Sequence, residues 1–206
     1  MRVLVACEFS GTVRDEFIRA GHEAMSCDLL PTDIPGPHIM GDVIGVLGKG
    51  WDLMIAHPPC TYLTVSGNKW MKPEFAFRFP TRAQDRKDAI EFFMALWNSD
   101  IPRVCIENPI GIMSTEFRKP DQVVQPWMFG HGETKATCLW LRGLPKLIPT
   151  HRKNDLFAPE EPKEREQRLH YLPPSPDRWK ERSKTFKGIA KAMADQWGRV
   201  GQMVDA

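Results

Sequence analysis

The chain of 206 residues is 42% hydrophobic and 26% charged, a composition typical of a soluble globular protein with one domain. It has no apolar run of the roughly 20 residues that cross a bilayer and no cleavable signal, so we expect a cytoplasmic protein without membrane contact. The formal net charge of +2 is too small to identify a nucleic-acid partner. Five scattered cysteines without a Cys-x-x-Cys pair predict reduced thiols and no metal.

Short apolar runs alternate with amphipathic segments, which predicts an α/β fold with a mostly parallel sheet and crossover helices. The predicted strands are residues 2–6, 22–27, 52–55, 102–106, 123–129 and 137–141. The predicted helices are residues 13–20, 82–98 and 186–197. Beyond residue 144 the chain becomes polar and rich in proline, so we expect an irregular insert over about residues 144–182, within a single domain of residues 1–206.

Charge is distributed unevenly along the sequence. Residues 142–191 contain 13 Lys or Arg and 7 Asp or Glu. This local excess is compatible with a phosphate-bearing partner, and equally with a solvated surface that binds nothing.

Residues with functional chemistry occur where the predicted strands end. In an open parallel sheet, ligands bind beyond the carboxyl ends of the strands. The residues at these positions are Glu8, Ser10 and Gly11 after the first strand, Asp28 after the second, Asp42 before the third, Cys60 after the third, and Glu107 and Asn108 after the fourth. Each one alone is often a structural cap, but together they predict a site at this edge of the sheet.

Cys60 is the candidate nucleophile, since it follows two prolines at the end of a buried strand. Pro58 and Pro59 fix φ near about −65° and remove two donors, so the loop leaves the sheet in a restricted geometry. A thiol at this place can add to an electrophilic carbon, and a nearby glutamate can donate a proton as charge develops. The remaining cysteines lie in or beside apolar strands and are expected to be inert core residues: Cys7, Cys27, Cys105 and Cys138.

Taken in order, these motifs resemble the cytosine-C5 DNA methyltransferase family, which uses S-adenosylmethionine. The most specific part is Pro-Pro-Cys followed one strand later by Glu-Asn. The family's Tyr-Gly-Val-Pro-Gln-x-Arg-x-Arg strand has a degenerate counterpart at Phe129, Gly130, Glu133, Lys135 and Thr137. Residues 183–197 are similar to the closing segment of the family. The resemblance implies a Rossmann-like methyltransferase fold, with a mostly parallel sheet and helices on both faces.

The resemblance also implies roles for single residues. Cys60 would add to C6 of cytosine, Glu107 would bind N3, Asn108 would hold the loop or the base, and Lys135 would orient the base through O2 and assist Cys60. The loop of residues 66–72 would close over the base. S-adenosylmethionine, with S-adenosylhomocysteine as product, would contact Glu8, Phe9, Ser10 and Gly11 with its methionine portion, Asp28 with its ribose and Asp42 near its adenine, beside Pro58.

Several positions depart from the family pattern. Thr61 stands where the family has Gln, Pro109 where Val is usual, and His57 where a small residue is usual. Residues 144–182 are too few for the variable domain that reads DNA sequence in the family.

Four functions therefore remain open. The enzyme would accept DNA with little sequence specificity or through a recruited partner, or it would methylate a free cytidine nucleotide, which needs no base flipping. A nucleic-acid-binding or regulatory protein that keeps the fold without the chemistry is a third possibility. Amino-group methylation is less favoured, because those enzymes place an aromatic residue where this chain has Cys60. Compact proteins of this pattern are similar to those of phages and prophages, and the sequence gives no indication of an oligomeric state.

Overall fold

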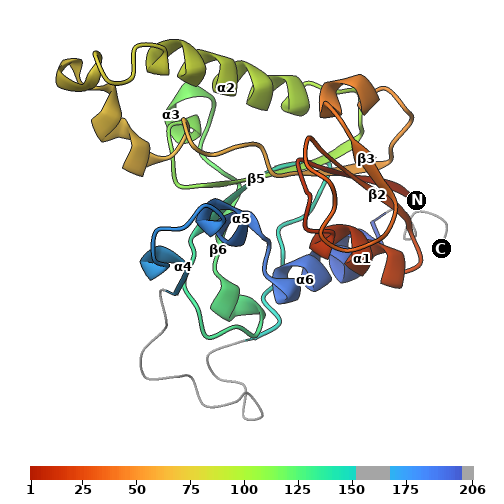
Figure 1. Ribbon diagram of the computed structural model, residues 1–206. Helices are drawn as coiled ribbons and strands as arrows, with labels where there is room; N and C mark the ends of the chain where they lie inside the picture. Colours follow the sequence, from red (N-terminus) through yellow and green to blue (C-terminus); the bar gives the residue numbers. More distant parts are fainter. Residues whose placement is uncertain (152–167, 201–206) are drawn as a thin grey trace.

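A seven-stranded sheet forms the centre of the computed structural model, which describes residues 1–151 and 168–200 (Figure 1). The strand order is β3-β2-β1-β4-β5-β7-β6. The strands are β1 (Arg2–Ala6), β2 (Glu23–Asp28), β3 (His38–Met40), β4 (Leu53–Ala56), β5 (Arg103–Pro109), β6 (Gln122–Val124) and β7 (Thr137–Arg142).

Five strands are parallel and follow the order 3-2-1-4-5 of a doubly wound sheet. The chain reverses its winding direction between β1 and β4, so the carboxyl ends of these two strands and of β5 open at one edge. β7 pairs antiparallel with both β5 and β6. The prediction of a mostly parallel, Rossmann-like α/β fold is confirmed, and the antiparallel β7 is an addition to it.

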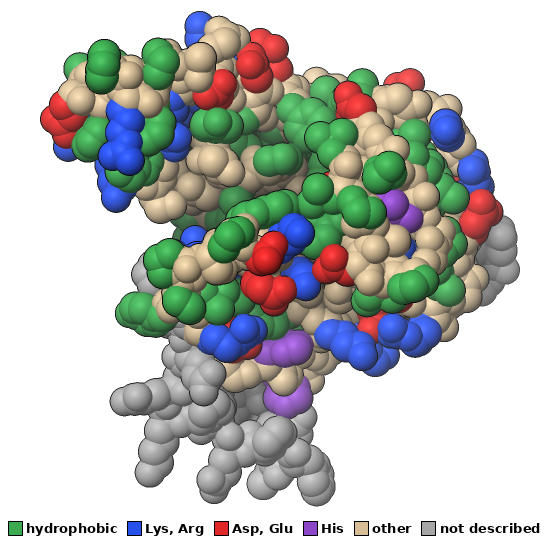
Figure 2. All heavy atoms as spheres, in the orientation of Figure 1, with side chains coloured by type: hydrophobic (Ala, Val, Ile, Leu, Met, Phe, Trp, Pro, Cys, Tyr) green, Lys and Arg blue, Asp and Glu red, His purple; other side chains and the backbone are tan. Residues whose placement is uncertain are grey.

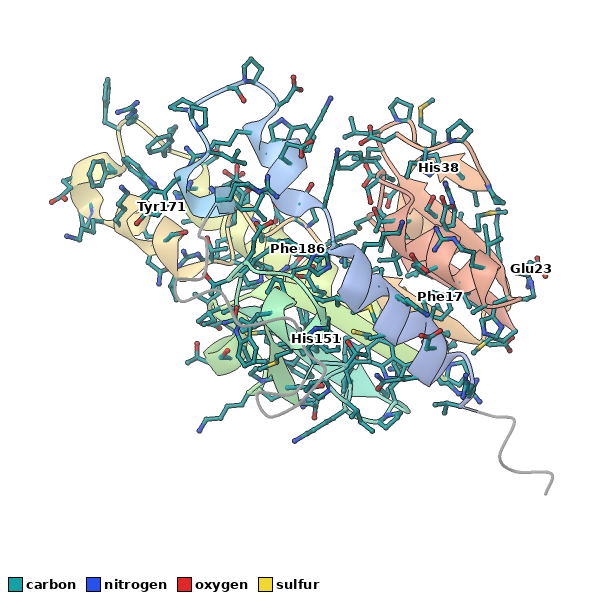
Figure 3. The ribbon with its side chains drawn as sticks, turned by 90° about the horizontal axis from the view of Figure 1, so that it is seen from below. Phe17, Glu23, His38, His151, Tyr171 and Phe186 are labelled. Atoms are coloured by element: carbon teal, nitrogen blue, oxygen red, sulfur yellow. The ribbon has the colours of Figure 1, made fainter. Side chains whose placement is uncertain are left out.

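Helices cover both faces of the sheet, as predicted (Figure 1). On one face, α1 (Thr12–Arg19) and α6 (Lys187–Trp197) pack on the side chains of Val3, Val5 and Ile55. Phe17 of α1 lies beside α6 in the view from below (Figure 3). On the other face, α2 (Arg82–Trp97), α3 (Met113–Glu116) and the 3-10 turn η1 (Val43–Val46) pack on the alternate residues of the same strands.

The alternation of side chains explains why the central strands have no polar face. Successive residues of a strand point to opposite faces, and here both faces are covered by helices. β4 (Leu53–Ala56) is therefore fully buried along its whole length. Such continuous apolar runs are typical of parallel sheets, and they are the reason why the sequence located these strands.

Several elements differ from the sequence prediction. The strand predicted at residues 123–129 ends at Val124, and the 3-10 turn η4 (Pro126–Phe129) follows, because Pro126 lacks the N–H that a continued ladder requires. The short edge strand β3 was not predicted. The polar segment contains two short helices, α4 (Arg168–Tyr171) and α5 (Arg178–Ser183), where irregular structure was expected. Residues 152–167 of that segment lie outside the described residues.

Two further 3-10 turns, η2 (Val65–Met71) and η3 (Pro73–Phe75), extend the loop between β4 and α2. We call residues 64–81 the arm. The arm projects from the body in Figure 1, and Figure 2 shows the surface hollowed beneath it. Within the described residues, no helix has the length and apolar character needed to cross a bilayer.

Candidate active site

An open cleft lies at the carboxyl ends of β1, β4 and β5 and contains about 560 Å³ of empty space. All four predicted catalytic residues line it: Cys60, Glu107, Asn108 and Lys135. Four of the predicted cofactor residues also line it: Glu8, Phe9, Ser10 and Pro58. Gly11, Asp28 and Asp42 are not among its lining residues. Cys7, His57 and residues 182–185 also line the cleft. The sequence placed His57 beside the site and likened the segment from Ser183 onward to one that returns to the cofactor site, whereas Cys7 was expected to be an inert core residue.

The loop that carries Cys60 is held at both ends. At its start, the backbone N–H of His57 donates to Ala6 O on β1 at 2.9 Å. After Cys60, the backbone N–H groups of Leu63 and Thr64 donate to the carbonyl oxygen of Cys60 at 3.0 and 3.1 Å. The thiol therefore stands on a turn that is fixed by backbone hydrogen bonds, as the two prolines predicted.

Asn108 fastens this loop to the neighbouring strand. Its Nδ2 donates to Pro58 O at 2.9 Å, and the side chain is buried. Its Oδ1 is also buried and has no hydrogen-bond partner within the described part of the chain. Asn108 thus contacts the loop that carries Cys60, and its role toward a base stays a prediction.

The Cys60 thiol is in its protonated form at neutral pH. Burial, followed by the negative charge of Glu107, raises its pKa above the ordinary value, although the charges of Lys135 and Arg182 act in the opposite direction. The thiol is thus not an activated nucleophile by itself. Activation requires that a ligand change the balance of charge in the cleft.

Glu107 is paired with His57. The two residues follow Ile106 and Ala56, which face each other on β5 and β4, and His57 Nδ1 lies 3.0 Å from Glu107 Oε2. Burial would raise the pKa of Glu107, but the hydrogen bond from His57, the charge of Lys135 and a hydrogen bond from Thr137 lower it below its ordinary value. Glu107 is therefore a carboxylate in the resting protein, whereas donation to N3 of cytosine requires the acid form.

Lys135 lies close enough to Glu107 and Cys60 for its charge to act on both. Its backbone N–H donates to Gln125 Oε1 at 2.9 Å, and its Nζ lies 3.5 Å from Lys184 O. Among the described residues that line the cleft, Lys135 is the one charged residue from the loop that precedes β7. The structure leaves its predicted role toward the O2 atom of a base as an expectation.

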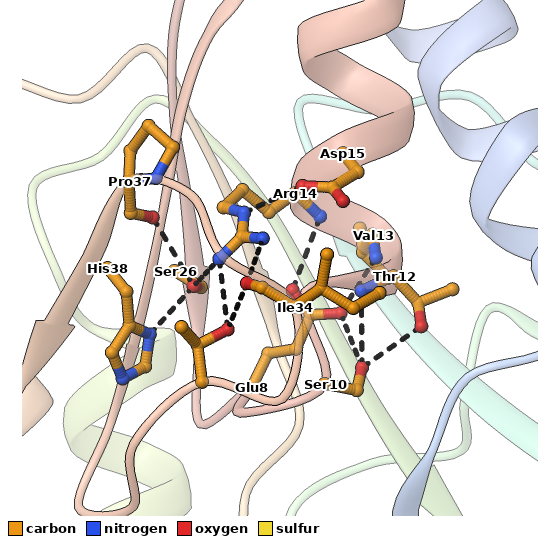
Figure 4. Close-up of polar contacts among 11 residues, drawn as sticks. Glu8, Ser10, Thr12, Val13, Arg14, Asp15, Ser26, Ile34, Pro37 and His38 are labelled. Carbon is orange, nitrogen blue, oxygen red and sulfur yellow. Dashed lines mark hydrogen bonds and ion pairs between the residues drawn. The ribbon is translucent and has the colours of Figure 1, made fainter.

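Glu8 has a structural role that the sequence did not indicate (Figure 4). Its Oε1 accepts hydrogen bonds from Val13 N at 2.7 Å and from Ser10 Oγ at 3.1 Å, and its Oε2 accepts one from Arg14 N at 3.2 Å. A carboxylate satisfies the free N–H groups at the start of a helix and is stabilised by the helix dipole. Glu8 therefore caps α1 from inside the fold and holds the turn of Phe9, Ser10 and Gly11.

Arg14 is the second buried residue that shapes this region, and its side chain is 0% exposed. Its guanidinium donates to Asp15 Oδ1 at 2.8 Å, to Ser26 Oγ at 3.2 Å, to Thr32 Oγ1 at 3.1 Å and to Ile34 O at 2.8 Å. These bonds tie the loop after β2 to α1 (Figure 4). No pattern in the sequence separates this arginine from a solvent-exposed one.

Asp28 and Asp42 lie beside the cleft, near Cys7. Burial first, and then the charges of these two aspartates and the thiol of Cys27, raise the pKa of Cys7. Asp28 is half-buried and its Oδ1 accepts from Leu30 N at 2.9 Å. Asp42 is exposed and caps η1 by accepting from Ile44 N at 2.9 Å. The two carboxylates therefore lie at one end of the cleft, next to the turn of residues 7–11.

Residues 182–185, at the end of α5 and after it, line the cleft, and α5 also contacts the turn of residues 7–11. Trp179 of α5 packs on Phe9 with ring centroids 6.0 Å apart. Lys184 Nζ forms ion pairs with Asp33 at 3.1 Å and with Glu181 at 2.8 Å. The polar segment thus reaches the cleft, although its sequence shows only a basic, proline-rich composition.

Solved structures of three methyltransferases align with parts of the chain. The chain aligns at 16% identity and a TM-score of 0.44 with a structure described as a DNA modification methyltransferase encoded within a prophage (E. coli), over 68% of this chain and 46% of that one. The Entamoeba histolytica methyltransferase EhMeth aligns at 14% identity and a TM-score of 0.48, over 74% of this chain and 57% of that one. The S. pombe Dnmt2 methyltransferase aligns at 13% identity and a TM-score of 0.46, over 97% of this chain and 66% of that one. The chain therefore spans about half to two thirds of the length of these structures. No family model and no curated protein sequence matches the chain.

Proposed function

We propose that the protein is a methyltransferase that transfers a methyl group from S-adenosylmethionine to C5 of cytosine in DNA, through a covalent bond between Cys60 and C6. One observation carries the proposal: a single cleft is lined by Cys60, Glu107, Asn108 and Lys135, which come from three separate segments of the chain. The pairing of Pro-Pro-Cys with Glu-Asn is thus a pairing in space as well as in sequence.

The chemistry of cytosine explains why these groups belong together. C5 is too weak a nucleophile to accept a methyl group unaided, and addition of a thiolate to C6 makes it enamine-like. Charge then develops at N3, where an acid assists by donating a proton. Cys60 supplies the thiolate and Glu107 the acid, while the positive charge of Lys135 favours the thiolate.

The residues beside the cleft fit S-adenosylmethionine. An acid at the end of the second strand of such a sheet accepts hydrogen bonds from ribose hydroxyls, and the half-buried Asp28 occupies that position. The turn of Phe9 and Ser10 lines the same cleft as Cys60, and the methionine portion would lie against it. Glu8 is committed to α1 and would support this turn. When bound, S-adenosylmethionine supplies the methyl group.

Basic side chains on both sides of the cleft favour a polynucleotide substrate. The arm carries Lys69, Lys72 and Arg78, all exposed, and α5 carries Lys180 and Arg182. Phosphate groups of a nucleic acid bind such charges. A free cytidine nucleotide remains the second candidate, because residues 144–182 are few for a domain that reads sequence.

The test is methyl transfer from labelled S-adenosylmethionine to duplex DNA, single-stranded DNA, RNA and cytidine nucleotides in parallel. We expect label at C5 of cytosine in DNA, and none with Cys60→Ala, which should still bind S-adenosylmethionine. Cys105→Ala is the matched control, since Cys105 is fully buried and does not line the cleft. Label in the nucleotide pool alone would select the second candidate. Undiminished transfer by Cys60→Ala, or transfer to none of the four pools, would contradict the proposal.

A further inference from the structure

His57 and Glu107 form an enclosed pair at the floor of the cleft. Their side chains are 8% and 11% exposed, and His57 Nδ1 lies 3.0 Å from Glu107 Oε2. His57 Nε2 is buried and has no hydrogen-bond partner among the described residues. Buried polar groups are nearly always paired, so an unpaired imidazole nitrogen beside a carboxylate in a cleft points to a functional demand on this histidine.

The protonation states in the cleft are the reverse of those that the proposed reaction needs. Cys60 is held as a thiol and Glu107 as a carboxylate, whereas attack on cytosine needs a thiolate and an acid. Glu107 must therefore receive a proton after the substrate has entered. His57 is in direct hydrogen-bond contact with the carboxylate, and its imidazole ring can carry and release a proton.

We propose that His57 is a positioning residue that holds Glu107 in place and stores the proton that Glu107 presents to N3 of the cytosine. This inference rests on the proposed function. It goes beyond the resemblance, because the family usually carries a small residue at this position. Since His57 acts through Glu107, it is distinct from the catalytic residues that contact the base.

One proton serves both halves of the cycle. The Cys60 thiol first gives its own proton to water. The stored proton passes from Nδ1 of the His57 imidazolium to Glu107, which delivers it to N3 while the Cys60 thiolate bonds to C6 and the displaced π electrons move through C5 and C4 to N3. Once C5 carries the methyl group, its hydrogen leaves as a proton to water and the C5–H pair forms the C5–C6 double bond. The sulfur departs with the S–C6 pair and regains a proton from water, and N3 returns its proton through Glu107 to His57.

Other charged and titratable groups face the pair and bear on its pH dependence. Lys135 stabilises the Glu107 carboxylate, and Cys60 faces it from the loop after β4. Asp28 is close enough for the charge of a protonated His57 to lower the pKa of Asp28, although burial of Asp28 has the larger and opposite effect. The thiols near Glu107 belong to β5 and β7: Cys105 and Cys138.

Two variants separate hydrogen bonding from proton storage. In His57→Asn the side-chain amide can donate from nearly the position of Nδ1 but does not titrate, and in His57→Ala both functions are absent. His22→Asn is the control, because His22 lies before β2, away from the cleft. Thermal melting of each variant shows whether it is folded before further measurements are made.

The decisive readout needs no methyl transfer. Titration of the free protein with ¹³C-carboxyl-labelled glutamate, with Glu107→Gln to assign the signal, gives the protonation midpoint of Glu107. We expect this midpoint to rise by about 1–3 pH units in His57→Ala, and to be unchanged in His22→Asn. The rate of methyl transfer to cytosine should depend on pH differently in His57→Asn than in the unaltered protein, while KM changes little.

The outcomes distinguish the two proposals. An unchanged Glu107 midpoint in folded His57→Ala, or a pH profile of His57→Asn identical to that of the unaltered protein, overturns the role of His57. A shifted midpoint in a protein that methylates no cytosine substrate shows the coupling of the pair but overturns the proposed function, and with it the delivery of the proton to N3.

Discussion

Cys60 lies on a fixed turn in the cleft, yet its thiol is not activated in the free protein. Its loop is fixed by hydrogen bonds to its carbonyl oxygen and by Asn108. Burial and the charge of Glu107 nevertheless raise the pKa of the thiol. The thiol is therefore expected to react slowly in the free protein.

The first prediction concerns the reactivity of Cys60 in the free protein. Alkylation by iodoacetamide should be slow at neutral pH and should accelerate as the pH rises toward the raised pKa, because the thiolate is the reactive form. Glu107→Gln removes a charge that raises the pKa of Cys60, so its alkylation should be faster, by up to about tenfold for each unit of lowered pKa. Lys135→Met should have the opposite effect.

Rates of modification can be followed by peptide mass spectrometry at a series of pH values. Cys105 serves as an internal reference, since it is fully buried and should remain unmodified. Rates in Glu107→Gln and Lys135→Met equal to those of the unaltered protein would show that these charges do not control the thiol.

At this scale the sequence identified the reactive residues better than the supporting ones. Cys60, Glu107, Asn108 and Lys135 were each recognisable from a local motif, and the fold brings them to one cleft. The acid Glu8 was also predicted to lie there, but its carboxylate is used to cap α1. His57 was expected beside the site as a departure from the family pattern, but its contact with Glu107 could not be predicted, because the two residues lie 50 positions apart in the chain.

Among the secondary-structure elements, α6 depends on a histidine at its start. His131 Nε2 accepts a hydrogen bond from the backbone N–H of Gly188 at 2.9 Å, and its ring contacts Phe186 with centroids 5.1 Å apart. Phe186 precedes α6 and lies between the two halves of the molecule in the view from below (Figure 3). Acceptance at Nε2 requires that this nitrogen carry no proton.

The second prediction is a loss of stability on mild acidification. Burial lowers the pKa of His131 below its ordinary value, with only partial opposition from the charge of Glu133. A group whose pKa is lower in the folded state stabilises the protein fully above its unfolded pKa of about 6.5, and this contribution disappears as the pH falls through the folded value. The melting temperature should therefore decrease as the pH is lowered from about 7 to about 5.

His131→Gln is the test variant, because a glutamine oxygen can accept the same hydrogen bond without titrating. We expect it to melt with a weaker dependence on pH over this interval. His22, whose pKa is also lowered, chiefly by burial, contributes in the same direction, so some dependence should remain. Equal pH dependence in both proteins would refute the role assigned to His131.

The differences between predicted and observed elements have local causes. β6 (Gln122–Val124) is shorter than the apolar run suggested, because Pro126 cannot donate to the ladder and begins a turn. β3 (His38–Met40) is held by His38, whose ring contacts Ser26 Oγ at 2.8 Å and Leu30 O at 2.9 Å. Three half-exposed residues carry too little periodicity to predict a strand.

Considered as a whole, the molecule presents basic side chains on two sides of its cleft. In the arm, Trp70 packs against Phe75 and Phe79 at centroid distances of 4.9 and 5.4 Å, which gives this exposed segment a small core of its own. Phe77 is fully exposed at its tip. Figure 2 shows Lys and Arg side chains on the projecting arm.

The third prediction is that duplex DNA binds with a strong dependence on salt. Each neutralised phosphate contributes about −0.9 to the slope of log K against log salt. The triple variant Lys69→Glu, Lys72→Glu and Arg78→Glu should therefore bind more weakly at low salt and show a slope smaller in magnitude by about 2–3. Fluorescence anisotropy at several salt concentrations measures both quantities.

Lys191→Glu provides the matched control, since this exposed lysine lies on α6 and pairs with Asp195 rather than facing the cleft. Its binding slope should equal that of the unaltered protein. An affinity for DNA that does not change with salt would count against a polynucleotide substrate and in favour of the free nucleotide.

The sequence by itself indicated most of the strands and the residues expected to react. Both are local properties: buried parallel strands require continuous apolar runs, and Pro58, Pro59 and Cys60 form a motif without reference to the rest of the chain. The tertiary structure decided the protonation of Glu107, the engagement of Glu8, the burial of Arg14 and the pairing of His57. These properties depend on which groups from distant segments become neighbours and on how far those groups are removed from water. No local stretch of sequence determines either one.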